Sequence, residues 1–330
     1  MKQMRNVLLT GATGFVGSAL LDYLCNDAEC DVRIATRSSV ENRPLAACKV
    51  FKVGDFTSAP DWIEALTGVD CIVHLAGRAH VMRREIDALT LFRKANTEAT
   101  VELARQAIEC GVKRFIFISS IGVNGSFTQT APFDEMSTPA PFADYAISKY
   151  ESEVKLQSLC ASSAMELVII RPPLVYAAHA PGNFQRLLKL AATGIPLPFG
   201  CVRNSRSMVA LENLVDFIAL CIVHPNAANE LFLVSDSAAL STPELIKCIR
   251  RGMGRRNFMI RVPLPLLRVM TICMGKENLY TQLCCSLTID SGKARQLLGW
   301  VPPVHTEQAL VKAGREFIIN RTAREYADGV

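Results

Sequence analysis

Short, continuously apolar runs alternate with helical patterns through the first half of this chain, and this alternation most limits its possible folds. A strand that is apolar on both faces needs cover on both faces, as in a parallel sheet flanked by helices. Right-handed crossovers then predict an α/β, doubly wound parallel sheet. The expected strands are Asn6–Thr10, Val32–Thr36, Val50–Val53, Cys71–Leu75, Phe115–Ser119 and Val168–Ile170. The expected helices among them are Ser18–Cys25, Asp61–Leu66 and Leu89–Cys110.

A glycine-rich segment, TGATGFVG, follows the first expected strand and leads into the first helix. Glycines in such a turn let the backbone approach a pyrophosphate, while free N–H groups and the helix dipole favour the anion. This context predicts a Rossmann-type dinucleotide site. The residues expected to form its loop are Gly11, Gly14, Phe15, Val16 and Gly17.

The ends of the next strands indicate which dinucleotide is bound. A site selective for NAD usually carries Asp or Glu at the end of the second strand, where this chain has Arg37. Arg37 can pair with a 2′-phosphate, so NADP(H) is favoured and NAD(H) is possible. Asp55 and Phe56 follow the third strand, where a carboxylate can accept from the adenine amino group. Leu75, Ala76 and Gly77 close the fourth strand and leave room for the dinucleotide.

Prolines and loops become frequent after Arg171, and the helices become shorter, such as Phe184–Ala192 and Pro243–Arg251. A chain of 330 residues suggests about two domains of ~150 residues. We therefore expect a Rossmann-type NAD(P)-binding domain over residues 1–171 and a smaller mixed substrate domain over residues 172–330.

The segment YAISK carries the predicted acid–base chemistry. On a helix, Tyr145 and Lys149 are one turn apart and share a face. A nearby ammonium and a cationic nicotinamide ring would lower the pKa of a tyrosine from its usual value near ~10. Ser119 and Ser120 end the fifth strand, where a hydroxyl can hold a substrate oxygen. Neighbouring strand residues face opposite ways, so only one of these serines should enter the site.

The segments TGATGFVG, HLAG, FIFISSIGVNG and YAISK, in this order, resemble the extended short-chain dehydrogenases/reductases that act on nucleotide sugars. The resemblance spans nearly the whole chain. It implies that Ser120, Tyr145 and Lys149 carry proton transfer during hydride exchange at a sugar carbon, with Tyr145 and Lys149 also contacting the cofactor. It also implies that residues 209–236 return to the dinucleotide-binding domain as a helix and a last strand.

Small differences within this family point to the reaction. The family's 4,6-dehydratases carry an Asp-Glu pair where this chain has Ile121 and Gly122, so dehydration is not expected. The segments RPPLVY, NFQRLLKL and NELFLVSD are most similar to a bacterial O-antigen group. That group contains reductases of UDP-4-keto-6-deoxy-N-acetylhexosamines and related UDP-sugar 4-epimerases.

The resemblance therefore implies an NAD(P)H-dependent reduction of the 4-keto group of a UDP-linked 4-keto-6-deoxy amino sugar, in O-antigen or polysaccharide precursor synthesis. One alternative is a 4-epimerase of UDP-GlcNAc or UDP-glucose with tightly bound NAD; the 4-epimerases commonly have a tyrosine where this chain has Asn124. Another is a non-catalytic dinucleotide sensor, which would typically have lost Tyr145 or Lys149.

Cations for a UDP-sugar diphosphate are expected in the second half of the chain. Arg206 matches a family position where an arginine clamps phosphate oxygens, in a geometry that suits bidentate contact. Asn183 opens a helix after Pro181-Gly182 and caps that helix or meets a phosphate. Arg78 and His80 follow the fourth strand and are candidates to line the sugar pocket.

Composition excludes several other classes. The net charge of +5, without basic clusters, argues against nucleic acid as a partner. The twelve cysteines are scattered, without CxxC pairs or histidines at metal-ligand spacing, so a metal site is not expected. We expect these cysteines to be free thiols in a cytoplasmic protein. Val262–Gly275 is the most apolar stretch outside the strands and is too short to span a bilayer. A homodimer is possible.

Overall fold

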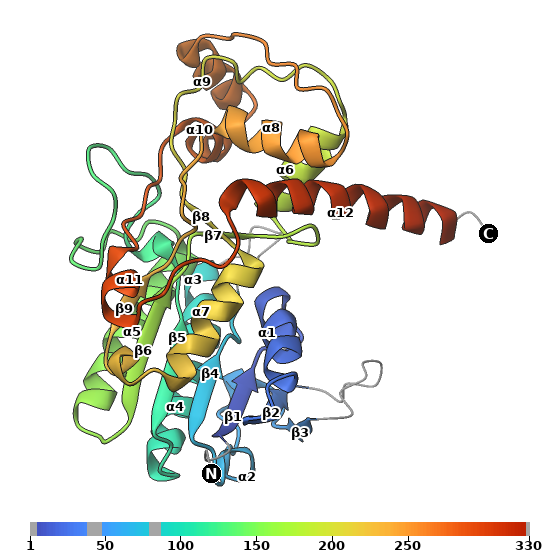
Figure 1. Cartoon of the computed structure of the whole chain (residues 1–330). Coiled ribbons are helices and arrows are strands. Elements are labelled where there is room, and N and C mark those ends of the chain that lie inside the picture. The colour runs from blue at the N-terminus through green and yellow to red at the C-terminus, as the bar shows by residue number, and fades with distance from the viewer. Residues whose placement is uncertain (1–4, 38–47, 79–86, 328–330) are drawn as a thin grey trace.

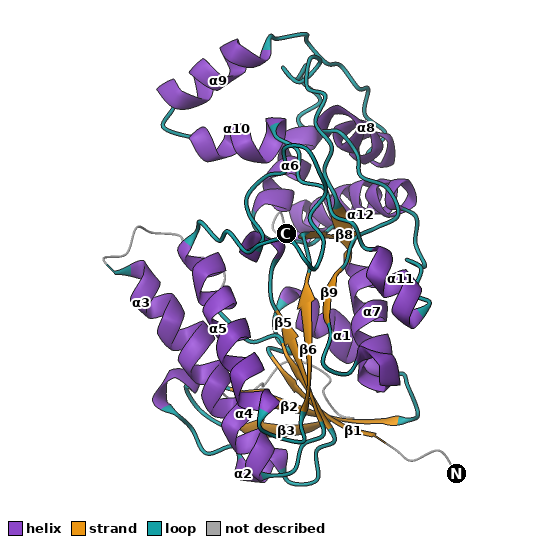
Figure 2. Cartoon of the chain, turned by 90° about the vertical axis from the view of Figure 1, so that its left-hand side faces the viewer, coloured by secondary structure: helices purple, strands orange, loops and turns teal. Residues whose placement is uncertain are grey.

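Seven parallel strands form the central sheet, in the order β3-β2-β1-β4-β5-β6-β9 (Figures 1 and 2). The computed structural model describes residues 5–37, 48–78 and 87–327, with side-chain surroundings through residue 322. This topology confirms the expected α/β, doubly wound fold class. The strands of this sheet are β1 (Arg5–Thr10), β2 (Cys30–Thr36), β3 (Lys49–Lys52), β4 (Cys71–His74), β5 (Arg114–Ile118), β6 (Glu166–Arg171) and β9 (Leu231–Leu233).

Helices cover both faces of the sheet because its strands are apolar on both faces. In β1, Val7 and Leu9 face one apolar core and Leu8 faces the other. The first core is covered by α1 (Phe15–Cys25), α7 (Leu211–Val223) and α11 (Gly292–Leu298). The second is covered by α2 (Ile63–Leu66), α4 (Ala99–Glu109) and α5 (Asp144–Ala161).

A second lobe stands over the carboxyl ends of the strands (Figure 1). It contains a small parallel pair, β7 (Leu174–Tyr176) with β8 (Met208–Ala210), and its own apolar core. Its helices are α6 (Asn183–Ala192), α8 (Thr242–Gly252), α9 (Leu264–Cys273), α10 (Glu277–Cys284) and α12 (Thr306–Ala327). The chain returns from this lobe to the sheet through α7 and β9. The domain limits expected from the sequence remain a prediction.

The segment expected as one helix over Leu89–Cys110 is interrupted. It consists of α3 (Ala88–Phe92), a π-helical turn (Arg93–Glu98) and then α4. Asn96 lies in the π-helical turn, and its carbonyl accepts a hydrogen bond from the Ser152 hydroxyl of α5 at 3.0 Å. Hydroxyls of neighbouring residues therefore satisfy backbone groups in the widened turn, a type of interruption that often marks functional sites.

Two negative features of the described ranges bear on function. None of the helices in residues 5–37, 48–78 and 87–327 combines the length and apolar character needed to cross a bilayer. The twelve cysteines are all free thiols.

Candidate active site

The glycine loop between β1 and α1 leaves no room for side chains at two of its three glycines. Gly11 has φ of +73°, and a Cβ on it would lie 2.7 Å from the backbone nitrogen of Ala76, at the end of β4. A Cβ on Gly17 would lie 2.1 Å from the Gly11 carbonyl oxygen. The loop is therefore folded tightly between β1 and β4, at the carboxyl edge where the strand order changes direction. In open α/β sheets this is the position where a dinucleotide binds.

The start of α1 suits the pyrophosphate of such a dinucleotide. Gly14 is the N-cap of α1 and brings no side chain to the helix end, so backbone N–H groups of the first turn can meet an anion. The Phe15 ring, at the first helical position, contacts the His179 ring of the second lobe edge to face at 5.1 Å between centroids. Phe15 thus closes the lobe interface beside the loop.

The residues expected at the adenosine end lie near one another. Asp55 caps a short 3-10 turn, where its carboxylate accepts from the Thr57 backbone N–H at 3.0 Å. This hydrogen bond holds the pKa of Asp55 below its usual value, with smaller contributions from the charges of Arg37 and Lys94. Arg37 is exposed immediately after β2. Phe56 packs against Trp62, edge to face at 4.9 Å.

The three residues expected to carry catalysis come from two adjoining elements. Ser120 follows β5 and is the N-cap of a 3-10 turn, Ile121–Val123, whose Gly122 N–H it accepts at 3.1 Å. A Cβ on Gly122 would lie 3.2 Å from the Ala146 Cβ of α5. This close approach places the turn that carries Ser120 against the turn of α5 that carries Tyr145 and Lys149.

Ser119 faces away from this group, as the alternation of strand residues predicts. Its hydroxyl is buried and donates to Glu153 of α5. Glu153 also accepts from the guanidinium of Arg171, at 3.0 Å from the Arg171 Nε. A further guanidinium nitrogen of Arg171 donates to the Asn124 side-chain oxygen at 2.9 Å. Glu153 and Arg171 are both buried, so their charges are paired inside the protein beneath the catalytic group.

Burial shifts the protonation of both predicted acid–base residues. The Lys149 ammonium donates to the Ile118 carbonyl at 2.9 Å and lies 4.5 Å from the centre of the Phe117 ring. Burial lowers the pKa of Lys149 to about 8, and the nearby Glu153 carboxylate opposes this change. Burial raises the pKa of Tyr145 to about 12, the opposite direction from the lowering expected with a cationic nicotinamide ring present.

Asn96 was not identified from the sequence, although it braces the site. Its side chain is buried, accepts from the Arg78 N–H at 2.7 Å and donates to the Arg78 carbonyl at 3.1 Å. The same amide donates to the Ser148 hydroxyl of α5 at 3.0 Å. Gly77 fits between this amide and Lys149, since a Cβ there would lie 3.1 Å from the Asn96 oxygen. Asn96 therefore fixes the segment after β4 against α5.

His74 supports the same segment from below. Its Nδ1 is hydrogen-bonded to the Thr10 hydroxyl at 2.8 Å, and its Nε2 is hydrogen-bonded to the Thr100 hydroxyl at 2.9 Å. Burial, and then the charge of Lys149, lower the pKa of His74 to about 3, so the ring is neutral. The Thr10 hydroxyl also accepts from the Ala76 N–H at 3.3 Å, next to Leu75.

The expected substrate residues are dispersed. Arg206 is half-buried in the second lobe, where its guanidinium donates to the Cys285 carbonyl at 3.0 Å and to the Thr281 carbonyl at 3.4 Å. Burial lowers the pKa of Arg206. Asn183 is the first residue of α6, and its side-chain oxygen accepts from Arg186 at 3.4 Å, while Gly182 is the N-cap. The capping role considered for Asn183 is therefore wrong. His80 lies outside the described residues.

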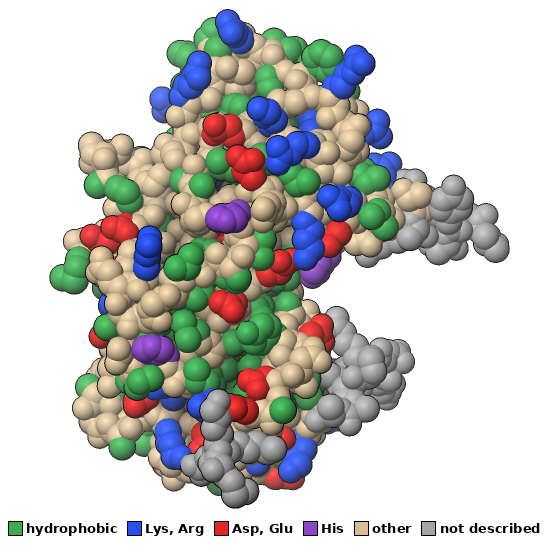
Figure 3. Space-filling model, in the orientation of Figure 1, with side chains coloured by type: hydrophobic (Ala, Val, Ile, Leu, Met, Phe, Trp, Pro, Cys, Tyr) green, Lys and Arg blue, Asp and Glu red, His purple; other side chains and the backbone are tan. Residues whose placement is uncertain are grey.

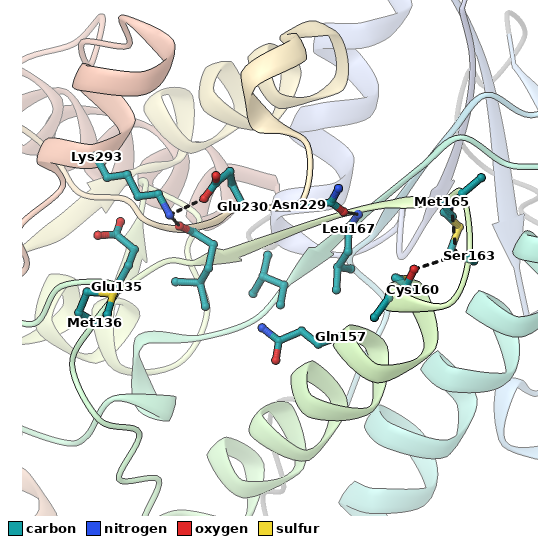
Figure 4. Close-up of a pocket in the computed structure, with 14 residues that line it drawn as sticks. Glu135, Met136, Gln157, Cys160, Ser163, Met165, Leu167, Asn229, Glu230 and Lys293 are labelled. Atoms are coloured by element: carbon teal, nitrogen blue, oxygen red, sulfur yellow. Dashed lines mark hydrogen bonds and ion pairs between the residues drawn. The ribbon is translucent and has the colours of Figure 1, made fainter.

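A cavity of about 710 Å³ lies between the β5–α5 loop and α10. Asn124, at the end of the 3-10 turn Ile121–Val123, lines one end, and Thr281, whose carbonyl accepts from Arg206, lines the α10 side. A different cavity of about 510 Å³ lies at the β6–β9 edge of the sheet, where Lys293 points toward Glu230 and Gln157 lies opposite (Figure 4). None of the expected site residues lines either cavity. The cavity at α10 lies between Asn124, which directly follows the 3-10 turn Ile121–Val123, and Thr281, whose carbonyl accepts from Arg206.

Comparison with known proteins identifies the family. The model of the NAD dependent epimerase/dehydratase family matches residues 7–234. The chain belongs to this family. The match confirms the family resemblance seen in the sequence, and the epimerase/dehydratase family makes the protein an NAD-dependent enzyme.

Two curated relatives and one solved structure have informative names. The chain is 40% identical over 320 residues to a UDP-glucose 4-epimerase of Vibrio cholerae, covering 96% of this chain and 97% of that protein. It is 27% identical to an N-acetyl-α-D-glucosaminyl-diphospho-ditrans,octacis-undecaprenol 4-epimerase of Escherichia coli O157:H7, covering 92% and 93%. The crystal structure of a UDP-glucose 4-epimerase of Thermotoga maritima with UDP-glucose has a TM-score of 0.75 at 22% identity, covering 96% and 99%, and shows the shared fold.

Gly17→Ala should disrupt the dinucleotide site of this epimerase/dehydratase family member. The added methyl group would meet the Gly11 carbonyl at 2.1 Å, so the loop must move. Overpacking of this kind typically costs about 1–3 kcal/mol. We expect a lower melting temperature and at least about tenfold weaker NAD binding by calorimetry. Ser18→Ala, one residue later, is the control. A folded Gly17→Ala protein with unchanged NAD affinity would contradict this account of the loop.

Lys149→Met should stabilise the protein near neutral pH. Burial holds the pKa of Lys149 at about 8, and its unfolded pKa is about 10.4. Between these values the unfolded chain binds the proton and the native protein does not, so wild-type stability rises with pH. Below pH 8 the wild type carries the full cost of a buried charge, on the order of 3 kcal/mol.

The measurement is urea unfolding of Lys149→Met and wild type from pH 7 to pH 10. We expect the methionine variant to be more stable at pH 7 and the difference to shrink as the pH rises. Lys155→Met, on the exposed side of the same helix, should show no such trend. A Lys149→Met variant that is less stable at every pH would refute the assigned cost of burial.

Proposed function

We propose that this protein is a 4-epimerase of a UDP-linked sugar that keeps its NAD bound between turnovers. The catalytic part of the proposal rests on the position of Ser120 against the turn of α5 that carries Tyr145 and Lys149, close to the end of β4 that the glycine loop contacts. The choice of epimerisation rests on the relatives' names. The two relatives described above are both named for 4-epimerisation of a sugar attached to a diphosphate, and the nearer in sequence of these two is named for UDP-glucose.

Tyr145, Ser120 and Lys149 have separate roles in the proposed epimerisation at C4. NAD, when bound at the glycine loop, would supply the acceptor for the C4 hydride and the donor for its return. Tyr145 takes the proton of the C4 hydroxyl as the hydride leaves, and gives the proton back when the hydride returns to the opposite face of the ketone. Ser120 donates a hydrogen bond to the C4 oxygen, and Lys149 holds the nicotinamide ribose. The Tyr145 phenolate needs a nearby positive charge, because burial alone raises the pKa of Tyr145 to about 12.

The remaining site residues are proposed to bind the dinucleotide and the UDP-sugar. Residues at the glycine loop and the strand ends hold the dinucleotide, and residues of the second lobe hold the sugar diphosphate. The proposed dinucleotide residues are Gly11, Gly14, Phe15, Val16, Gly17, Arg37, Asp55, Phe56, Leu75, Ala76 and Gly77. The proposed substrate residues are Arg78, His80, Asn183 and Arg206. The cavity lined by Thr281 and Asn124 lies between the loop after Ser120 and the helix whose carbonyls bind Arg206, and is proposed to take part of the sugar nucleotide.

The 4-ketoreductase expected from the sequence uses the same catalytic residues, so those residues do not favour it over epimerisation. The relatives' names support the epimerase alternative better than the reductase. The two activities differ in net redox change: a reductase consumes one reduced dinucleotide per product, and an epimerase consumes none. A role in O-antigen precursor synthesis stays a prediction.

Incubation of the purified protein with UDP-glucose or UDP-GlcNAc, without added reduced cofactor, should produce the 4-epimer by chromatography. Tyr145→Phe should lower kcat by about 10²–10⁴, the usual contribution of a general acid–base group, with NAD binding retained. Tyr150→Phe on the same helix is the control. Consumption of NADPH or NADH on UDP-4-keto-6-deoxy-GlcNAc, with no epimerisation in the first assay, would establish the reductase instead.

Arg37 is proposed to set the preference between NADP and NAD. If its guanidinium meets a 2′-phosphate, Arg37→Ala should weaken NADP binding by roughly 10–100-fold, the value of a charge-assisted hydrogen bond, and leave NAD binding nearly unchanged. Titration of the dinucleotide-free protein measures both affinities. Lys52→Ala, an exposed cation on β3, is the control. Equal losses for the two dinucleotides would assign Arg37 to the protein surface.

A further inference from the structure

Helix α9 is apolar on two sides, although only one side is packed. Leu267 is buried and, with Leu264, contacts the apolar core of the second lobe. A second row of side chains recurs at the i, i+3, i+4 and i+7 positions and is exposed, so it forms one continuous face of the helix. We call this row the outer stripe; it consists of Leu266, Val269, Met270 and Cys273.

The exposed fractions in the outer stripe are large for such residues. Leu266 is 53% exposed, Val269 is 54% and Met270 is 48%. Met274 extends the apolar surface beyond the end of the helix at 59%. Isolated exposed apolar residues are ordinary, but a contiguous group of this kind marks a contact surface for another phase or molecule.

The charges of the same segment are all positive. Residues 253–276 contain no Asp or Glu. All five cations of this segment are exposed: Arg268 lies on α9, Arg261 and Lys276 lie within three residues of its ends, and Arg255 and Arg256 follow α8. Figure 3 shows Lys and Arg side chains interspersed with hydrophobic ones over this upper lobe.

We propose that the outer stripe of α9 docks on the surface of an anionic lipid bilayer. Apolar side chains enter the headgroup region while the flanking cations meet the negative lipid headgroups, which is how interfacial helices bind. A helix of ten residues is about 15 Å long, half the hydrocarbon thickness of a bilayer, so α9 lies on the surface. A second copy that docks through its own outer stripe fits this face poorly, because it would bring Arg261, Arg268 and Lys276 against the same cations of the first copy.

The position of α9 in the fold suits this contact. Figures 1 and 2 both place α9 at the end of the second lobe farthest from the sheet. Its neighbour α10 runs back from this end and lines the cavity near Arg206 through Asn278 and Thr281. Docking therefore leaves the sheet and the glycine loop away from the bilayer and turns the α9–α10 hairpin toward it.

The test is sedimentation of the full chain with vesicles of phosphatidylcholine alone or mixed with phosphatidylglycerol, at low and high salt. The wild type should sediment with the anionic vesicles, more weakly at high salt, and not with the neutral ones. Leu266→Ser, Val269→Ser and Met270→Ser together should reduce partitioning at least about tenfold. Arg261→Gln with Lys276→Gln, beside the two ends of α9, should reduce it by about 30-fold if each cation meets the anionic surface.

Matched variants distinguish binding through this surface from non-specific adsorption to vesicles. Ile63→Ser, Val301→Ser and Ile319→Ser change three residues that are 58–59% exposed elsewhere, and this triple variant should bind vesicles like the wild type. Lys52→Gln with Arg105→Gln makes the same change in net charge at distant exposed cations and should also bind normally. Circular dichroism and melting temperature establish that every variant is folded.

Three results would overturn the proposal. One is a wild type that stays in the supernatant with anionic vesicles. Another is equal loss of vesicle binding in the outer-stripe variant and its matched triple. The third is a wild type that forms oligomers by light scattering and an outer-stripe variant that is monomeric, since the stripe would then contact a second copy.

Discussion

Glu153 joins the elements that carry the proposed catalytic residues. Its buried carboxylate joins α5 to the end of β5 through Ser119 and to the end of β6 through Arg171. Breaking a buried ion pair by removing one partner leaves the other charge uncompensated, which is strongly destabilising. Because Glu153 is one helical turn from Lys149, the same carboxylate also raises the pKa of that lysine against the effect of burial. Glu153 thus both connects α5 to the strand ends beside it and raises the pKa of Lys149.

This arrangement explains why the two neighbouring serines have different tasks. The strand alternation turns Ser119 inward to Glu153, and Ser120 then begins the 3-10 turn that contacts α5 through Gly122 and Ala146. A change at Ser119 would move the strand end from which Ser120 projects. The geometry of the proposed catalytic residues therefore depends on groups that are not themselves proposed to contact the substrate. Asn96 acts similarly on the segment after β4, by binding both backbone groups of Arg78.

The sequence predicts those parts of the structure that depend on local spacing. Continuous apolar runs, a glycine loop after a strand, and Tyr145 one turn before Lys149 are all readable without tertiary contacts. Glu153 falls on the same helical face as Lys149, yet its partner Arg171 is identified only when β6 is placed beside β5. The π-helical turn at Asn96 is hidden because the apolar period of residues 89–110 continues through it. Arg206 is placed by carbonyls of a hairpin about 80 residues later, as the 79-residue separation from Cys285 shows.

The α9–α10 hairpin of the second lobe has one packed side and one exposed apolar side. Its α9–α10 hairpin fixes Arg206 from one side, through the carbonyls of Thr281 and Cys285. The other side of the hairpin bears the outer stripe, which contributes nothing to the core. An exposed apolar face lowers solubility and does not stabilise the fold. A face of this kind next to the proposed diphosphate site is therefore typical of a contact surface. A bilayer contact at α9 would be transmitted to Arg206 through a single packed hairpin, and surface binding and substrate binding would then share one structural element.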